Sequence, residues 1–145
     1  MMDIAIEQAR RSDFEEVLGL LRAQKLPVDD LESHLDTTLV ARRDGAIVGS
    51  VAVEVYADGG LLRSVAVASD VQGLGVGRKL TEAAFSLAEA RGLPALYLLT
   101  TTAETYFPKF GFERITRAEV PASVQASVEF TSACPSSAVV MRRRS

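Results

Sequence analysis

The chain has 145 residues, of which 48% are hydrophobic and 24% charged, so it is long enough to bury a core as a single domain over residues 1–145. Its net charge of −3 argues against nucleic acid as the main partner, and no apolar stretch approaches the ~20 residues that cross a bilayer. The N-terminal residues lack a signal-peptide pattern, and one histidine with one cysteine (His34 and Cys134) favours neither a zinc site nor a disulfide, so we expect a cytoplasmic protein without a metal.

The first expected elements are a strand over residues 4–10 and an amphipathic helix. Ser12 and Glu15 have the spacing of a capping box, which predicts that the helix begins there. Its apolar positions repeat at helical spacing: Phe14, Val17, Leu18 and Leu21. A short second helix is expected over residues 29–35.

An antiparallel hairpin is predicted next. Two β-prone runs, residues 38–43 and 46–55, flank Asp44-Gly45, a dipeptide that is typical of tight hairpin turns. A further strand over residues 61–67 extends this antiparallel unit.

The second half predicts a glycine-rich loop, a helix and more strands. Residues 72–77 lead into the helix, which Gly92 and Pro94 end, and an apolar strand follows at residues 96–99. A strand–helix–strand unit of this kind implies a right-handed crossover and parallel pairing. The remaining expected elements are a short helix over 103–109, a strand from Phe112 and a strand over 138–141, with residues 142–144 as a solvated basic tail. The predicted class is α+β with a mixed sheet.

The glycine loop carries the chemical signal. Glycines at 73, 75 and 77 follow a strand and open a helix, where unpaired amides and the positive end of the helix dipole favour an anion. Arg78 adds positive charge at this helix end. The sequence matches neither the P-loop nor the dinucleotide-binding glycine pattern. It therefore predicts a phosphate-containing ligand of another kind.

Residues 72–77, Gln-Gly-Leu-Gly-Val-Gly, resemble the acetyl-CoA loop of the GNAT acetyltransferases, Gln/Arg-x-x-Gly-x-Gly/Ala. The preceding strand and the later Phe110-Gly111-Phe112 also resemble that family, and the element order agrees over nearly the whole chain. The resemblance implies the GNAT fold, a mixed and mostly antiparallel sheet flanked by helices, with acetyl-CoA as cosubstrate. The implied cofactor-binding residues are Val65, Ala66, Val67, Gln72, Gly73, Leu74, Gly75, Val76, Gly77, Arg78 and Thr100.

The catalytic residues are less well defined by the resemblance. Family members often place a proton-donating tyrosine four residues before the glycine of the Gly-Phe pair, but here Phe107 holds that position and Tyr106 precedes it. Tyr106 is therefore a candidate acid or a wall residue, and Phe107 a candidate acceptor contact. Glu54 and Glu113 are the candidate carboxylates for the general base, with Glu54 preferred.

The second half further resembles N-acetylglutamate synthases and the small arsenic-resistance-associated N-acetyltransferases. This implies a small-molecule amine acceptor, an amino acid or an arsenic- or phosphorus-containing analogue, whose carboxylate Arg63 or Arg114 would bind. Acetylation of a protein amine and acetyl-CoA binding without turnover remain alternatives, and a homodimer is possible. Residues 118–137 are expected to cover the acceptor site as a lid.

Overall fold

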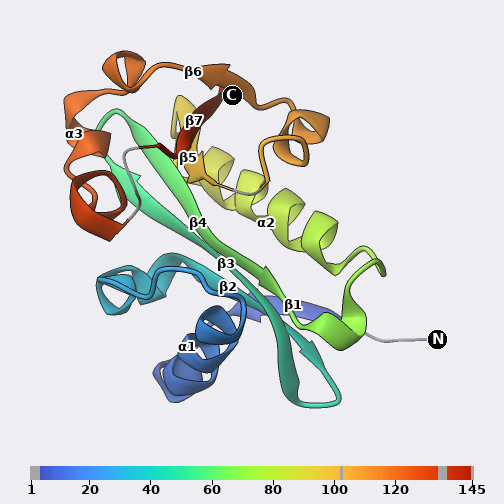
Figure 1. Ribbon diagram of the computed structural model, residues 1–145. Coiled ribbons are helices and arrows are strands. Elements are labelled where there is room, and N and C mark those ends of the chain that lie inside the picture. Colours follow the sequence, from blue (N-terminus) through green and yellow to red (C-terminus); the bar gives the residue numbers. More distant parts are fainter. Residues whose placement is uncertain (1–3, 102, 134–136, 145) are drawn as a thin grey trace.

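A twisted seven-stranded sheet runs through the computed structural model, which describes residues 4–101, 103–133 and 137–144 (Figure 1). In these ranges β4 pairs with β5 in parallel and the other neighbouring strands pair antiparallel, in the order β1-β2-β3-β4-β5-β7-β6. This confirms the α+β class and the mostly antiparallel sheet expected from the sequence. The strands are β1 Ala5–Gln8, β2 Thr38–Arg43, β3 Ala46–Tyr56, β4 Gly59–Val67, β5 Ala95–Thr100, β6 Glu113–Ile115 and β7 Val139–Arg144.

Helices cover both faces of the sheet (Figure 1). The longest, α2 (Val76–Ala90), packs on one face, where Val51 and Val53 of β3 join its buried side chains. On the opposite face α1 (Phe14–Ala23) and the 3-10 helix η2 (Leu31–Thr37) pack with Ala52. Because successive side chains of a strand point to opposite faces, β3 contributes to both cores.

The hairpin between β2 and β3 has the predicted turn. Asp44 and Gly45 both have positive φ, 52° and 83°, as a two-residue type I′ turn requires, and Arg43 pairs with Ala46 across it.

A bulge in β4 shapes the centre of the sheet. Ser50 pairs with Ala66 but Ala52 pairs with Arg63, so that β4 carries one more residue than β3 in this interval. Ser64 takes up this extra length with φ of 59°, and its carbonyl accepts a hydrogen bond of 2.8 Å from the Ser50 hydroxyl. Such a bulge bends the strand away from its neighbour.

β4 and β5 separate beyond a short ladder. Within the described residues they pair at Gly60 with Leu96 and at Leu61 with Tyr97, and neither strand continues the pairing. The rest of β4 and the end of β5 therefore diverge and leave space between them.

The start of α1 differs from the prediction. Ser12 makes no capping hydrogen bond. Instead the Arg10 amide donates to the Asp13 carboxylate at 2.8 Å, and α1 begins at Phe14. Asp13 is buried and forms an ion pair with Arg42 of β2. Asp13, which pairs with Arg42 of the sheet, therefore precedes the helix in place of Ser12.

The basic run near the end of the sequence is not a solvated tail. Residues 142–144 belong to β7, where Arg142 pairs with Tyr97. The Arg143 guanidinium lies 4.0 Å from the ring centroid of Phe85 and donates a hydrogen bond of 2.8 Å to the Phe110 carbonyl. Its charge alone would favour exposure of residues 142–144 to water. Contacts with an aromatic ring and a carbonyl group instead hold Arg143 against the protein.

The helix expected over residues 103–109 is shorter than predicted. Residues 104–106 form a turn before the 3-10 helix η4 (Phe107–Phe110), so the helix expected over 103–109 is incomplete. In the later segment α3 covers Ala122–Gln125, between the 3-10 helix η5 (Arg117–Glu119) and the π-helix η6 (Glu129–Ala133). Cys134 lies outside the described residues.

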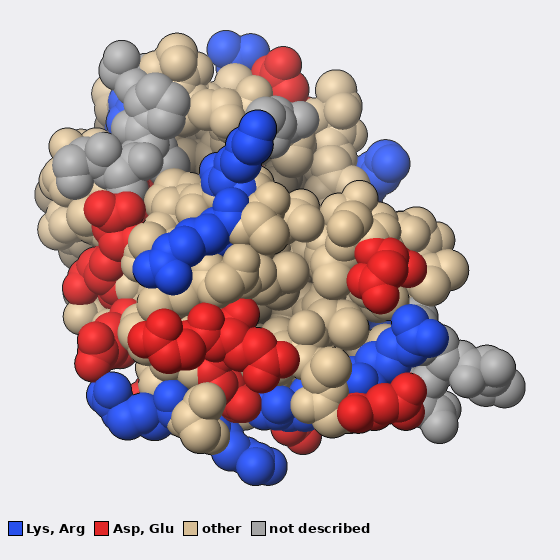
Figure 2. Space-filling view, turned by 60° about the horizontal axis from the view of Figure 1, so that its bottom comes forward, with Lys and Arg blue, Asp and Glu red and all other residues tan. Residues whose placement is uncertain are grey.

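The surface carries charges of both signs. On the face shown in Figure 2 acidic and basic side chains lie close together, with a run of basic side chains beside a cluster of acidic ones. Within the part of the chain that the structure describes, no helix has the length and apolar character needed to cross a membrane. Nor do three or more His, Cys, Asp or Glu side chains of that part come together as metal ligands.

Candidate acetyl-CoA and acceptor groove

A groove of about 870 Å³ occupies the space where β4 and β5 diverge. Its walls come from β4, the end of β5, the glycine loop with the first turn of α2, the residues after α1, and η4. From Arg63 to Val67, where β4 ends before the glycine loop, the strand advances roughly 13 Å, four residues at about 3.3 Å each. The groove can therefore hold an elongated ligand.

The glycine loop lies at one end of this groove. Gly73 and Gly75 have φ of 84° and 82°, a left-handed conformation that L side chains rarely adopt, and Gly75 is the N-cap of α2. The amides of the first helical turn are unpaired within the helix and favour an anion. Besides Arg63, three cations line the groove, Lys25, Arg78 and Lys109. This end has the backbone geometry and charge for a phosphate group.

The free edge of β4 forms one long wall. Val65, Ala66 and Val67 line the groove beyond the last residue pair with β5, so their backbone can pair with an extended ligand. Gln72 donates a hydrogen bond of 3.0 Å to the Val67 carbonyl. Leu74 is 58% exposed and does not line the groove, unlike the other predicted loop residues.

Tyr106 lies over the first turn of α2. A Cβ added at Gly77 would be 3.0 Å from the Tyr106 hydroxyl, so this glycine leaves the space that the hydroxyl needs. Phe107 also lines the groove, is buried, and packs edge-to-face on Tyr106 at 5.2 Å between ring centroids. Thr100, at the end of β5, lines the groove and accepts a hydrogen bond of 2.9 Å from the Ala103 amide.

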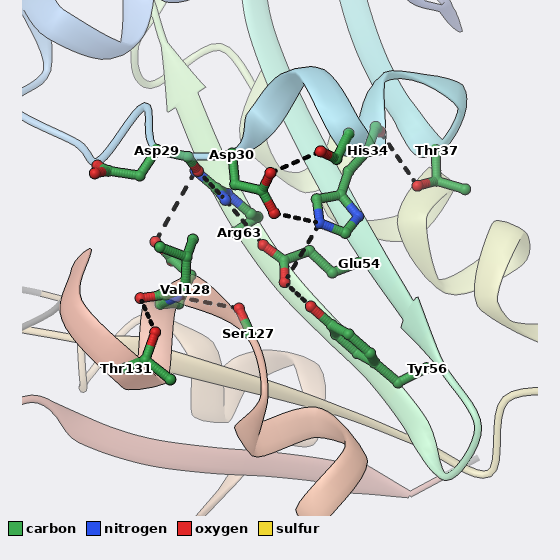
Figure 3. Close-up of polar contacts among 12 residues, drawn as sticks. Asp29, Asp30, His34, Thr37, Glu54, Tyr56, Arg63, Ser127, Val128 and Thr131 are labelled. Carbon is green, nitrogen blue, oxygen red and sulfur yellow. Dashed lines mark hydrogen bonds and ion pairs between the residues drawn. The ribbon is translucent and has the colours of Figure 1, made fainter.

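A buried polar network lies at the other end (Figure 3). The Glu54 carboxylate and the Arg63 guanidinium are 2.8 Å apart, and neither side chain is exposed. Arg63 also donates to the carbonyls of Asp29 at 2.7 Å and Pro27 at 3.3 Å. Arg63 lines the groove and Glu54 does not, so Glu54 holds Arg63 from behind.

Three more side chains complete this network (Figure 3). The Tyr56 hydroxyl donates to Glu54, and burial together with this carboxylate raises the pKa of Tyr56 above its ordinary value. His34 Nε2 lies 3.8 Å from Glu54 and 3.5 Å from Asp30. The pKa of Asp30 is below its ordinary value, first because the Ser33 hydroxyl donates to its carboxylate and also because of His34.

The sequence analysis did not identify Glu129 as a site residue. This residue begins η6, lines the groove and is 5% exposed, and its carboxylate lies 4.0 Å from Arg63. Its position between Val128 and Phe130 is a signal for burial, but its partner comes from a distant strand. Structure is needed to place it beside the groove.

The two other candidates lie outside the groove. The Arg114 and Glu113 side chains are 73% and 66% exposed, with ion pairs of 3.9 Å to Glu104 and 3.8 Å to Arg142. The segment expected to act as a lid packs partly against the sheet, where Val120 and Val124 are buried with Leu61 of β4, and its Glu129 lines the groove. Part of this segment, residues 134–136, lies outside the described residues.

Two proteins similar to this chain are amino-acid acetyltransferases. An amino-acid acetyltransferase from Ralstonia nicotianae is 36% identical over 93 residues, which are 63% of this chain and 21% of that protein. An amino-acid acetyltransferase from Neisseria meningitidis is 25% identical over 131 residues, covering 81% of this chain and 29% of that protein. This chain thus spans less than a third of these relatives.

The fold also matches solved structures. N-acetylglutamate synthase from Neisseria gonorrhoeae, complexed with coenzyme A and N-acetyl-glutamate, superposes with a TM-score of 0.84 at 23% identity, over 98% of this chain and 35% of that one. Rv2747 from Mycobacterium tuberculosis, in a complex that contains CoA, has a TM-score of 0.82 at 24% identity over 97% and 99% of the two chains. The family model of the acetyltransferase (GNAT) domain matches residues 34–114, from η2 to β6. The chain belongs to the GNAT acetyltransferase family.

Proposed function

We propose that this protein transfers the acetyl group of acetyl-CoA to the amine of a free amino acid or a close analogue. The observation that carries the proposal is the groove, which joins a glycine loop at a helix start, the free edge of β4 and a buried Arg63. An elongated cofactor with phosphates at one end and a reactive group at the other fits these features in that order.

The cofactor assignment follows the groove from end to end. The amides of Gly75, Val76 and Gly77 would hold the pyrophosphate, and Arg78 would add charge. The backbone of residues 65–67 would bond the pantetheine amides as a neighbouring strand does. The acetyl group would then lie towards Arg63 and Thr100, just beyond the residues at which β4 and β5 pair.

The acceptor class rests on charge and on similarity. Several similar proteins are named amino-acid acetyltransferases, and a structural neighbour was solved with N-acetyl-glutamate. A buried guanidinium such as Arg63 can bind a carboxylate, although here it already bonds Glu54. Arsenic- and phosphorus-containing amino-acid analogues share the required α-amine and belong in the same substrate panel.

A thiol-release assay with acetyl-CoA tests the proposal. The panel contains the free amino acids, arsenic and phosphorus analogues, and peptides with a free N-terminus or lysine, and mass spectrometry identifies each acetylated product. Turnover of a free amino acid or analogue above the peptides supports the proposal. Preference for a peptide amine contradicts the acceptor class, and acetyl-CoA binding without any turnover contradicts the activity.

A further inference from the structure

Glu129 is an acid at the end of the groove where Arg63 lies. It comes from η6 and lines the groove together with the residues after α1. Its side chain is 7% exposed, which is rare for a carboxylate that has no charged partner, and the ion pair with Arg63 supplies that partner. The groove therefore presents one buried carboxylate and one buried guanidinium within 4.0 Å of each other.

The charges that face Glu129 come from several elements. Arg63 of β4 is in contact, and Glu54 of β3 lies behind Arg63 with Tyr56, while His34 of η2 reaches Glu54. From η5, Arg117 stacks on the ring of Phe130 with 5.6 Å between guanidinium and centroid. Asp30 lies beyond His34. Among the described residues, Arg63 is thus in contact with two carboxylates, Glu54 behind it and Glu129 in the groove lining.

We propose that Glu129 binds the ammonium group of the acceptor and takes the proton that this group must lose before it attacks the acetyl group. The inference rests on the proposed function. The neutral amine nitrogen then bonds to the acetyl carbonyl carbon, and the bond from that carbon to sulfur breaks. The thiolate takes up the second proton from nitrogen and leaves as the free thiol, and Glu129 returns its proton to water.

The position of Glu129 distinguishes it from the other acids. Glu54 is completely buried and does not line the groove, so it reaches an acceptor through Arg63 or Tyr56 at best. Glu113 is 66% exposed and outside the groove. A base needs to lie within hydrogen-bond reach of the proton that it removes, directly or through one water. Of these three carboxylates, Glu129 is the one that lines the groove.

The test compares Glu129→Gln with wild type on whichever amine the wild type acetylates best. Gln keeps the size of the side chain and removes the base. At pH 7 the acceptor kcat/KM should fall by ~10²-fold, as for loss of a positioned base. The loss should shrink above the pKa of the acceptor amine, because water then supplies the neutral form. Acetyl-CoA affinity, measured by calorimetry, should change by less than about two-fold because Glu129 is far from the glycine loop.

Two variants separate catalysis from structure. Glu119→Gln removes an exposed carboxylate of the same segment but keeps an acceptor for the Thr116 amide, 3.0 Å away, and should match wild type. Glu129→Asp keeps the charge with a shorter reach and should recover part of the loss. If Glu129→Gln does not fold, Glu129→Asp takes its place, with a smaller loss that again shrinks at high pH.

The outcomes are distinct. Wild-type kcat/KM in Glu129→Gln, or a loss that is equal at every pH, overturns the role of Glu129 while leaving the proposed function intact. A wild-type preference for other amines overturns the proposed acceptor class, yet the comparison of variants still decides the role of Glu129. A wild type that acetylates no amine overturns both.

Discussion

Glu54→Gln is expected to lower the free energy of unfolding by about 3 kcal/mol. Loss of one charge from a fully buried pair leaves the other without its counter-ion, which costs about 3–5 kcal/mol. The lower end applies because Arg63 retains its bonds to two backbone carbonyls and still has Glu129 at 4.0 Å. Gln preserves the side-chain volume, so the loss reports charge and not a cavity.

Urea unfolding followed by circular dichroism measures this loss of unfolding free energy directly. In thermal unfolding, the melting temperature should fall by roughly 6–12 °C, because each kcal/mol corresponds to about 2–4 °C in a chain of this size. The matched control is Glu104→Gln, since Glu104 pairs with Arg114 at 3.9 Å with side chains 55% and 73% exposed. An exposed pair contributes less than about 1 kcal/mol. Equal losses in the two variants would refute the argument from burial.

Three other variants test the groove and the acid stability. Gly75→Asp should weaken coenzyme A binding, measured by calorimetry, by roughly 10-fold or more relative to Gly75→Ala. Both variants share the backbone strain at φ 82°, but only Asp repels phosphate. Equal affinities of the two variants would contradict a phosphate site. Tyr106→Phe should raise the acetyl-CoA KM by about 2–10-fold with kcat little changed, since the hydroxyl lies beside Gly77, whereas a ~10²-fold loss of kcat would identify Tyr106 as the acid. The hydrogen bond from Arg42 holds the pKa of Asp13 below its ordinary value of 3.8, so this stabilisation is complete above that value and is lost as pH falls through the lower folded pKa. In Asp13→Asn the free energy of unfolding should therefore depend less on pH in the acid range. An unchanged pH dependence would contradict the pairing.

Features that depend on neighbouring residues could be predicted from the sequence. Asp44 and Gly45 form the expected turn because their positive φ values are a local property. The glycine loop at the start of α2 is local for the same reason, and the alternation of helix and strand then indicated the fold. These signals also pointed to the family, which the comparisons show.

Features that depend on distant partners could not be predicted in this way. Asp13 replaces Ser12 at the start of α1 because Arg42, 29 residues later, pairs with it. Arg143 looks solvated in the sequence, and Phe85 and Phe110 hold it in the fold. Glu129 reaches the groove because the chain returns past β4 after η5, which no local pattern encodes. Residues that would bind the acceptor likewise depend on partners distant in the sequence.

The short ladder between β4 and β5 has a mechanical consequence. Within the described residues, the two pairs at Gly60 and Leu61 are the backbone pairing that joins one part of the sheet, β1 to β4, to the other, β5 to β7. This junction is tightly packed, because a Cβ added at Gly60 would meet the Leu93 side chain at 2.8 Å and the Leu96 side chain at 2.9 Å. A larger side chain at this position would therefore displace these leucines at the point where the two parts of the sheet join.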